Sequence, residues 1–206
     1  MKAFTGSVIF FIIFSNCSNP QTKDEQSTAE PSSQIVAPGE EGTRIIAEQT
    51  ASDTLKGSLK AKAMGTIGNA GVTINYYSPA VRGRIIWGGL VPFGNVWVTG
   101  AHRATSIDFN QEVIVGGVTI APGKYALFTI PGKDEWTIIV NKNWEQHLAD
   151  DYDSKDDIVR VTVKPETEDT HQERLRFTIE AASDTKGEIV IYWEKLEVSI
   201  PITVRN

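Results

Sequence analysis

The chain has 206 residues, of which 40% are hydrophobic, so it is long enough to form one domain with a buried core. Its formal net charge of −6 argues against a nucleic-acid binder, which would need a concentrated basic surface to neutralise phosphates. Because the chain has a single cysteine, the monomer can contain neither an internal disulfide nor a zinc site made of two or more thiolates.

Residues 1–16 have the pattern of a signal peptide. Lys2 supplies a positive charge, and residues 3–14 form an apolar run that is too short to span a bilayer as a helix. The run has the length of a signal-peptide core, so we expect it to be cleaved.

Cys17 follows this run directly, and its placement resembles a bacterial lipoprotein signal, in which the cysteine is acylated and becomes the new N-terminus. Phe14 and Asn16 depart from the commonest form of that signal, and the alternative is ordinary cleavage beside an incidental cysteine. We expect lipidation at Cys17, which would attach the protein to a membrane. The expected location is the bacterial cell envelope, as an outer-membrane lipoprotein facing the periplasm or the cell surface.

Residues 17–54 predict a lipidated, disordered linker. The segment is rich in Ser, Thr, Gln, Glu and Pro and has no aromatic residue, so it buries too little apolar surface to offset the entropy of ordering. Residues 18–54 hold two basic and seven acidic residues, against 17 and 19 in residues 55–206, so most of the net charge belongs to the linker. Alternatively, the short apolar pieces at 35–36 and 44–46 dock on the domain.

Residues 55–206 predict a single all-β domain, an antiparallel β-sandwich or jelly roll. Apolar and polar residues alternate at 72–76, 158–164 and 174–180, which is typical of strands with one face on a core and one in water. In the last of these, Leu175 and Phe177 would face the core and the charged residues the solvent. Further strands are expected near residues 59–64, 96–99, 105–109, 113–115, 118–121, 124–130, 136–141, 188–193 and 196–204.

Two connections in this domain have more specific signals. Gly116–Gly117 lies between two β-branched segments and predicts a hairpin turn, because both glycines accept a positive φ. Residues 144–150 form the one stretch that looks locally helical.

The residues from Tyr76 to Thr105 form three ordered motifs. They are a Tyr-x-x-Pro sequence at 76–79, a Gly-Arg-x-Ile block at 83–94 and a Trp-x-Thr-Gly-Ala block at 97–105, followed by similar blocks at 121–132, 135–139 and 193–194. This pattern resembles the bacterial exported domain-of-unknown-function family numbered 2911 (DUF2911). The resemblance implies the fold and export, and no activity, because none is established for the family. Val98, His102 and Arg103 stand where the family usually has Arg, Asn and an acidic residue.

The 76–105 stretch has two interpretations. In the structural one, its glycines allow close turns, Trp87, Phe93 and Trp97 bury apolar area, and Arg84 bonds loop carbonyls. In the functional one, a long connection on a rigid sandwich carries a binding cleft for a glycan or a small anionic ligand. The candidate ligand-binding residues are Arg82, Arg84, Trp97, His102, Arg103 and Thr105.

Catalytic or metal chemistry is hard to build from these residues. The three histidines, His102, His147 and His171, form no closely spaced ligand pair, and the formal triad of Ser106, His102 and Asp108 lacks a Gly-x-Ser-x-Gly elbow. The acidic run at 150–157 is a solvated turn or, alternatively, a calcium loop that departs from the EF-hand order.

We therefore expect no catalytic residue, no metal and no cofactor. The predicted function is a non-catalytic binding or interaction module. The alternatives are a hydrolase acting on carbohydrate or another envelope polymer, and a purely structural assembly partner.

Overall fold

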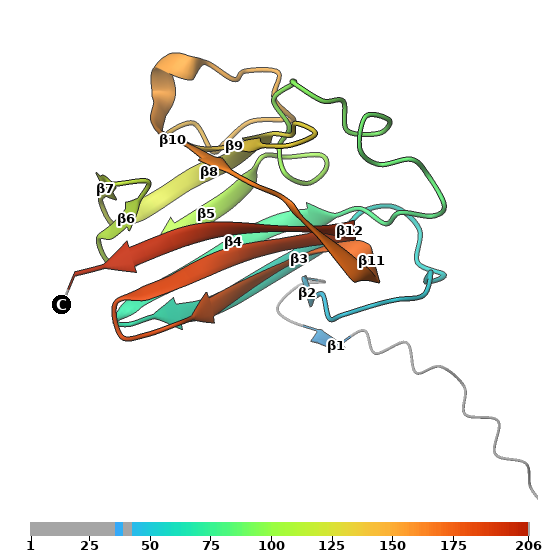
Figure 1. Cartoon of the computed structure of the whole chain (residues 1–206), viewed down its shortest axis with the longest axis horizontal. Coiled ribbons are helices and arrows are strands. Elements are labelled where there is room, and N and C mark those ends of the chain that lie inside the picture. The colour runs from blue at the N-terminus through green and yellow to red at the C-terminus, as the bar shows by residue number, and fades with distance from the viewer. Residues whose placement is uncertain (1–35, 39–42, 206) are drawn as a thin grey trace, which may run out of the picture. The chain divides into compact units, whose positions relative to one another are not determined.

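The computed structural model describes residues 36–38 and 43–205 (Figure 1). The predicted signal peptide, Cys17 and most of the predicted linker lie outside these residues. None of the helices in the described part of the chain is long and apolar enough to cross a membrane.

The described residues form two β-sheets. The first has eight strands in the order β1-β2-β3-β4-β5-β8-β9-β10, and the second has four in the order β11-β12-β6-β7. Neighbouring strands run antiparallel, except that β2 and β3 are parallel. The eight strands are β1 (Val36–Pro38), β2 (Arg44–Ile45), β3 (Leu59–Ile67), β4 (Ala70–Ser78), β5 (Thr105–Phe109), β8 (Gly123–Ile130), β9 (Trp136–Asn141) and β10 (Asp157–Val163). The four strands are β6 (Val113–Val115), β7 (Val118–Ile120), β11 (Glu166–Ala181) and β12 (Lys186–Val204).

The two sheets face each other, and the long β11–β12 hairpin packs against β3 and β4 (Figure 1). The core between them consists of the inward residues of each alternating strand, such as Ile74, Leu175 and Phe177, which are at most 3% exposed. The prediction of an all-β sandwich-like domain is therefore confirmed. The glycine turn is also confirmed, because Gly116 and Gly117 have φ of 56° and 82° and join β6 to β7.

Two predicted elements are wrong. Residues 96–99 form no sheet strand, because Thr99 has a φ of 52° and only Trp97 pairs, through an isolated bridge to Thr129. Residues 144–150 form turns instead of a helix. Their backbone groups bond a neighbouring loop, from Leu148 N to His102 O (3.0 Å) and from Ala104 N to Gln146 O (3.1 Å).

The described part of the predicted linker, residues 43–54, packs on the sandwich, as in the docking alternative. Arg44 pairs with Ala61 of β3, and Ile46 is only 7% exposed. Gln49 O accepts a hydrogen bond from Glu173 N (2.7 Å). The folded region thus begins earlier than residue 55, because backbone pairing and hydrogen bonds replace the apolar area that this polar segment lacks.

Candidate functional site

The connection between β4 and β5 bends back on itself without regular strands (green in Figure 1). Its backbone is tied to other elements at several points. Val81 N bonds Glu173 O (2.8 Å), Gly94 N bonds Pro131 O (2.8 Å) and Trp97 N bonds Thr129 O (2.7 Å). A connection held in this way is a rigid support for side chains that project from it.

This connection covers one cavity of about 340 Å³, which we call the cationic cavity. That volume lies in the range of small-molecule sites. Three basic side chains line it, and no aspartate or glutamate is among the described residues that do. The lining residues used below are Arg82, Arg84, Trp97, His102, Leu148 and Trp193.

Backbone carbonyls hold the two arginines of the cationic cavity in place. Arg82 Nη2 donates to Leu55 O, and Arg84 donates from Nε to Val81 O (3.1 Å) and from Nη2 to Ala80 O. Within the described residues neither guanidinium forms an ion pair with a carboxylate. Each guanidinium has five donors, so both retain hydrogen-bonding capacity. The carboxylate that lies nearest to this pair in the described contacts is Glu173, whose Oε1 accepts from the backbone N of Arg82 (3.0 Å).

Tryptophans form the apolar part of the site. Trp97 and Trp193 stack with ring centroids 5.7 Å apart and planes 18° apart, and both line the cationic cavity. Trp87 and Trp136 pack edge-on against this pair. Trp97 Nε1 donates to Gly100 O (3.0 Å), which fixes its ring. We call these four residues the tryptophan cluster; it joins the cavity to the core.

Backbone strain concentrates around the same cavity. Five non-glycine residues in the described chain have a φ in the left-handed region, at a cost of about 1–3 kcal/mol each. Three of them line the cavity, and the other two directly neighbour lining residues. The five residues and their φ values are Arg82 (50°), Thr99 (52°), His102 (63°), Leu148 (51°) and Glu194 (59°).

The structure brings together four of the six candidate residues, namely Arg82, Arg84, Trp97 and His102. Arg103 lines a different pocket from its neighbour His102. Thr105 is fully buried, and its Oγ1 donates to Thr99 O (2.9 Å), so it has a structural role.

Several cavity residues were not among the candidates. Leu148 comes from the segment predicted to be helical, Trp193 from β12, and Gly57 and Ser58 from just before β3. Of these four residues, Trp193 alone had a sequence signal, because it belongs to the 193–194 block that resembles the DUF2911 family.

A buried arginine fixes the wall formed by Gly57 and Ser58. Arg174 has 0% exposure, and its Nε and Nη2 donate to the two carboxylate oxygens of Asp53, with 2.8 Å from Nη2 to Oδ1. Its remaining donors bond the carbonyls of Leu55 (2.8 Å), Gly57 (3.2 Å) and Ser78 (3.0 Å). We call Arg174 and Asp53 the latch. The alternation in 174–180 predicted a solvent-facing Arg174; it is buried because residues 53–57 cover this end of β11.

The other histidines and the acidic run form local contacts. His147 Nδ1 lies 3.3 Å from Asp150 Oδ2, and His171 Nε2 lies 3.1 Å from Glu173 Oε2. No hydroxyl of the described residues is hydrogen bonded to a histidine ring, the contact that an activated nucleophile requires.

The acidic run gives no support to the calcium alternative. Asp153 Oδ1 accepts from Lys155 N (2.9 Å), and Asp157 accepts from Tyr152, Arg160 and Asn141. Among the described residues, no group of three or more possible ligands is placed to hold a metal ion.

These features define a class of protein: an all-β sandwich in which the connection between β4 and β5 covers a cavity lined by basic side chains and tryptophans. The family described as Protein of unknown function (DUF2911) matches residues 58–202. The chain belongs to this family, and the resemblance drawn from the motifs is confirmed. No curated protein and no solved structure gives a significant match to the chain.

Proposed function

We propose that this protein is a non-catalytic binding module whose cationic cavity holds a small anionic ligand, with acidic sugars as the candidate class. The observation that supports this most strongly is the composition of the cavity wall, in which Arg82, Arg84 and His102 meet tryptophan rings and no carboxylate. Guanidinium donors suit a carboxylate or phosphate, and the indoles suit the apolar face of the ligand. The strained backbone around the cavity is a second support.

A titration followed by tryptophan fluorescence tests this proposal, because Trp97 and Trp193 line the cavity. The probes are D-glucuronate, N-acetylneuraminate and inorganic phosphate. We expect at least one to bind the full-length protein. We expect the double variant Arg82→Gln/Arg84→Gln to weaken that binding by more than about tenfold, because it removes charge-assisted hydrogen bonds.

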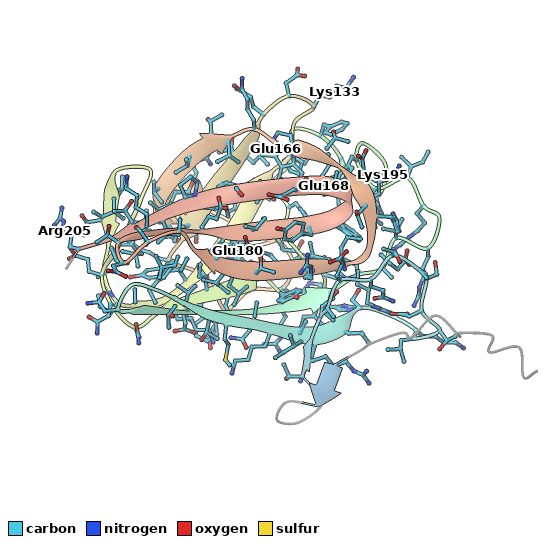
Figure 2. All side chains as sticks on the ribbon, turned by 60° about the horizontal axis from the view of Figure 1, so that its bottom comes forward. Lys133, Glu166, Glu168, Glu180, Lys195 and Arg205 are labelled. Carbon is cyan, nitrogen blue, oxygen red and sulfur yellow. The ribbon has the colours of Figure 1, made fainter. Side chains whose placement is uncertain are left out.

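The matched control is Lys133→Gln/Lys195→Gln, which removes two exposed cations elsewhere on the domain (Figure 2). It should leave the affinity unchanged. Binding that is equal in both double variants would show that the cavity arginines do not contact the ligand.

We further propose that the protein is exported and anchored in the bacterial cell envelope through acylated Cys17. The support is the sequence: an apolar run of signal-peptide length, the single cysteine directly after it, and a polar stretch before the domain. Acyl chains on the new N-terminus would give membrane attachment.

Fatty-acid labelling tests the anchor. Cys17→Ser should abolish labelling with radioactive palmitate and move the protein from the membrane fraction to the soluble fraction. Ser18→Ala, the neighbouring change, should leave both unaffected. Labelling that persists in Cys17→Ser would exclude Cys17 as the acylated residue.

A further inference from the structure

A second pocket, which we call the outer groove, lies on the outer face of the eight-stranded sheet. In β4 the residues Ile74 and Tyr76 face the core, so Asn75 and Tyr77 face outward. Ser106 of β5 faces outward for the same reason. The groove has a volume of about 200 Å³ and is closed at one side by Trp144 and Glu145. Its polar and aromatic lining residues are Thr43, Lys60, Asn75, Tyr77, Arg103, Ser106, Trp144 and Glu145.

Most polar side chains of the outer groove have no hydrogen-bond partner among residues 43–205. Ser106 is only 5% exposed as a residue, yet its hydroxyl is not among the buried unpaired atoms of the described residues, so the oxygen opens into the groove. Within the part of the chain that the structure describes, no side-chain hydrogen bond or ion pair is formed by Lys60, Asn75, Tyr77, Arg103, Ser106 or Glu145. A ligand with several hydrogen-bonding groups would satisfy them.

The aromatic residues of the groove are held in position. Tyr77 packs edge-on against His102, with ring centroids 5.0 Å apart. Trp144 packs against a small cluster that includes Ala104, and the Lys124 ammonium lies 3.9 Å from its ring centroid. Rigid aromatic faces that need no reordering reduce the cost of binding.

The chemistry of the groove differs from that of the cationic cavity. Lys60 and Arg103 are balanced in part by Glu145, and the hydroxyl and amide groups of Ser106 and Asn75 both donate and accept hydrogen bonds. A ligand that matches this lining is neutral, carries many hydroxyls and has an apolar face for an aromatic ring. A sugar ring has these three properties.

We propose that the outer groove is a binding site for a neutral saccharide, with Tyr77 packing on the ring and Ser106 and Asn75 bonding its hydroxyls. This site is separate from the cationic cavity. His102 lines the cavity, whereas its chain neighbour Arg103 and its ring partner Tyr77 line the groove, so the two sites adjoin at His102.

Ligand-observed NMR with the full-length protein tests this site. The probes are maltotriose, cellotriose and chitotriose, with saturation transfer to their ring protons as the signal. At least one should bind. Ser106→Ala should weaken binding by about three- to tenfold through the lost hydrogen bond, and Tyr77→Ala by about tenfold or more through the lost ring contact.

Three controls keep the outcomes distinct. Ser199→Ala makes the same change on β12 of the other sheet and should leave saccharide affinity unchanged. Ser106→Ala should leave D-glucuronate binding in the cationic cavity unchanged, so the two sites can fail separately. Thermal midpoints show whether each variant folds. If Tyr77→Ala does not fold, the affinity of Ser106→Ala alone tests the site.

Either of two results would overturn the saccharide site. One is the absence of saturation transfer from wild-type protein to all three probes. The other is a saccharide affinity of Ser106→Ala equal to that of the wild-type protein.

Discussion

The latch and the outer face of the β11–β12 sheet differ in how their charged side chains are paired. In the latch, each donor of Arg174 meets a carboxylate or carbonyl oxygen. On the outer face, carboxylates stand directly opposite one another across the strands, Glu166 opposite Glu197 and Glu180 opposite Glu188. Figure 2 shows Glu166, Glu168 and Glu180 on this one face. Like charges in such positions destabilise a sheet.

The two regions also have opposite pKa shifts. Hydrogen bonds from Arg174 hold the pKa of Asp53 below its ordinary value of 3.8. Burial, followed by the charges of Glu168 and Glu166, raises the pKa of Glu197 above its ordinary value of 4.5. The latch therefore stabilises the fold above about pH 4, whereas the repulsion at Glu197 acts above its raised pKa and is relieved as the pH falls.

The largest effect is expected for Arg174→Met, which leaves Asp53 buried without its cation. The free energy of unfolding should fall by about 3–5 kcal/mol, as measured by urea denaturation at pH 7. The deficit should shrink as the pH falls from 3.8 towards the lowered pKa of Asp53, at which the wild-type pair is lost.

Arg205→Met is the matched control for the latch. The Arg205 side chain is 68% exposed and pairs with Glu112 at 3.4 Å, so its loss should change stability by less than about 0.5 kcal/mol. Equal effects of the two substitutions would remove the distinction between a buried latch and a surface pair.

The smaller effect is expected for Glu197→Gln on the outer face. At pH 7 this variant should be more stable than wild type by about 0.5 kcal/mol, a value kept small because solvent screens a partly exposed group. The gain should vanish as the pH falls through the raised pKa of Glu197 towards 4.5, because wild-type Glu197 is then protonated as well.

Glu135→Gln, an exposed change near the β8–β9 turn, is the control and should show no such pH-dependent gain. A Glu197→Gln variant less stable than wild type at pH 7 would show that the outer-face carboxylate has a stabilising partner.

Most of the fold could be predicted from the sequence because alternation and turn chemistry are local. The strands at 105–109, 113–115 and 136–141 have the predicted bounds, and the Gly116–Gly117 turn needs only its two positive φ values. Residues 166–173 are all polar, so they show no alternation of apolar and polar residues. They extend β11 because β12 continues beside them through two register shifts, which alternation does not reveal.

The candidate site could be predicted in part. One contiguous stretch supplied Arg82, Arg84, Trp97 and His102, and the cavity contains all four. Local sequence does not indicate that Arg103 lines the outer groove, because that groove is assembled from β3, β4, β5 and residues 144–145. Nor does it indicate that Leu148 arrives from another segment, or that Arg174 is covered by residues 53–57, since both require the tertiary fold.

The latch also has a mechanical consequence. Any pull on the chain from the N-terminal side of Val36 reaches the short β1–β2 and β2–β3 pairings first, then the hydrogen bond between Gln49 O and Glu173 N, and then the five hydrogen bonds of Arg174. Those bonds connect the pulled segment to β11 and to the end of β4, so the load passes into the core of the sandwich. Gly57 O is the last of these acceptors before β3, so Ser58 and the cavity wall beyond it are shielded from the force.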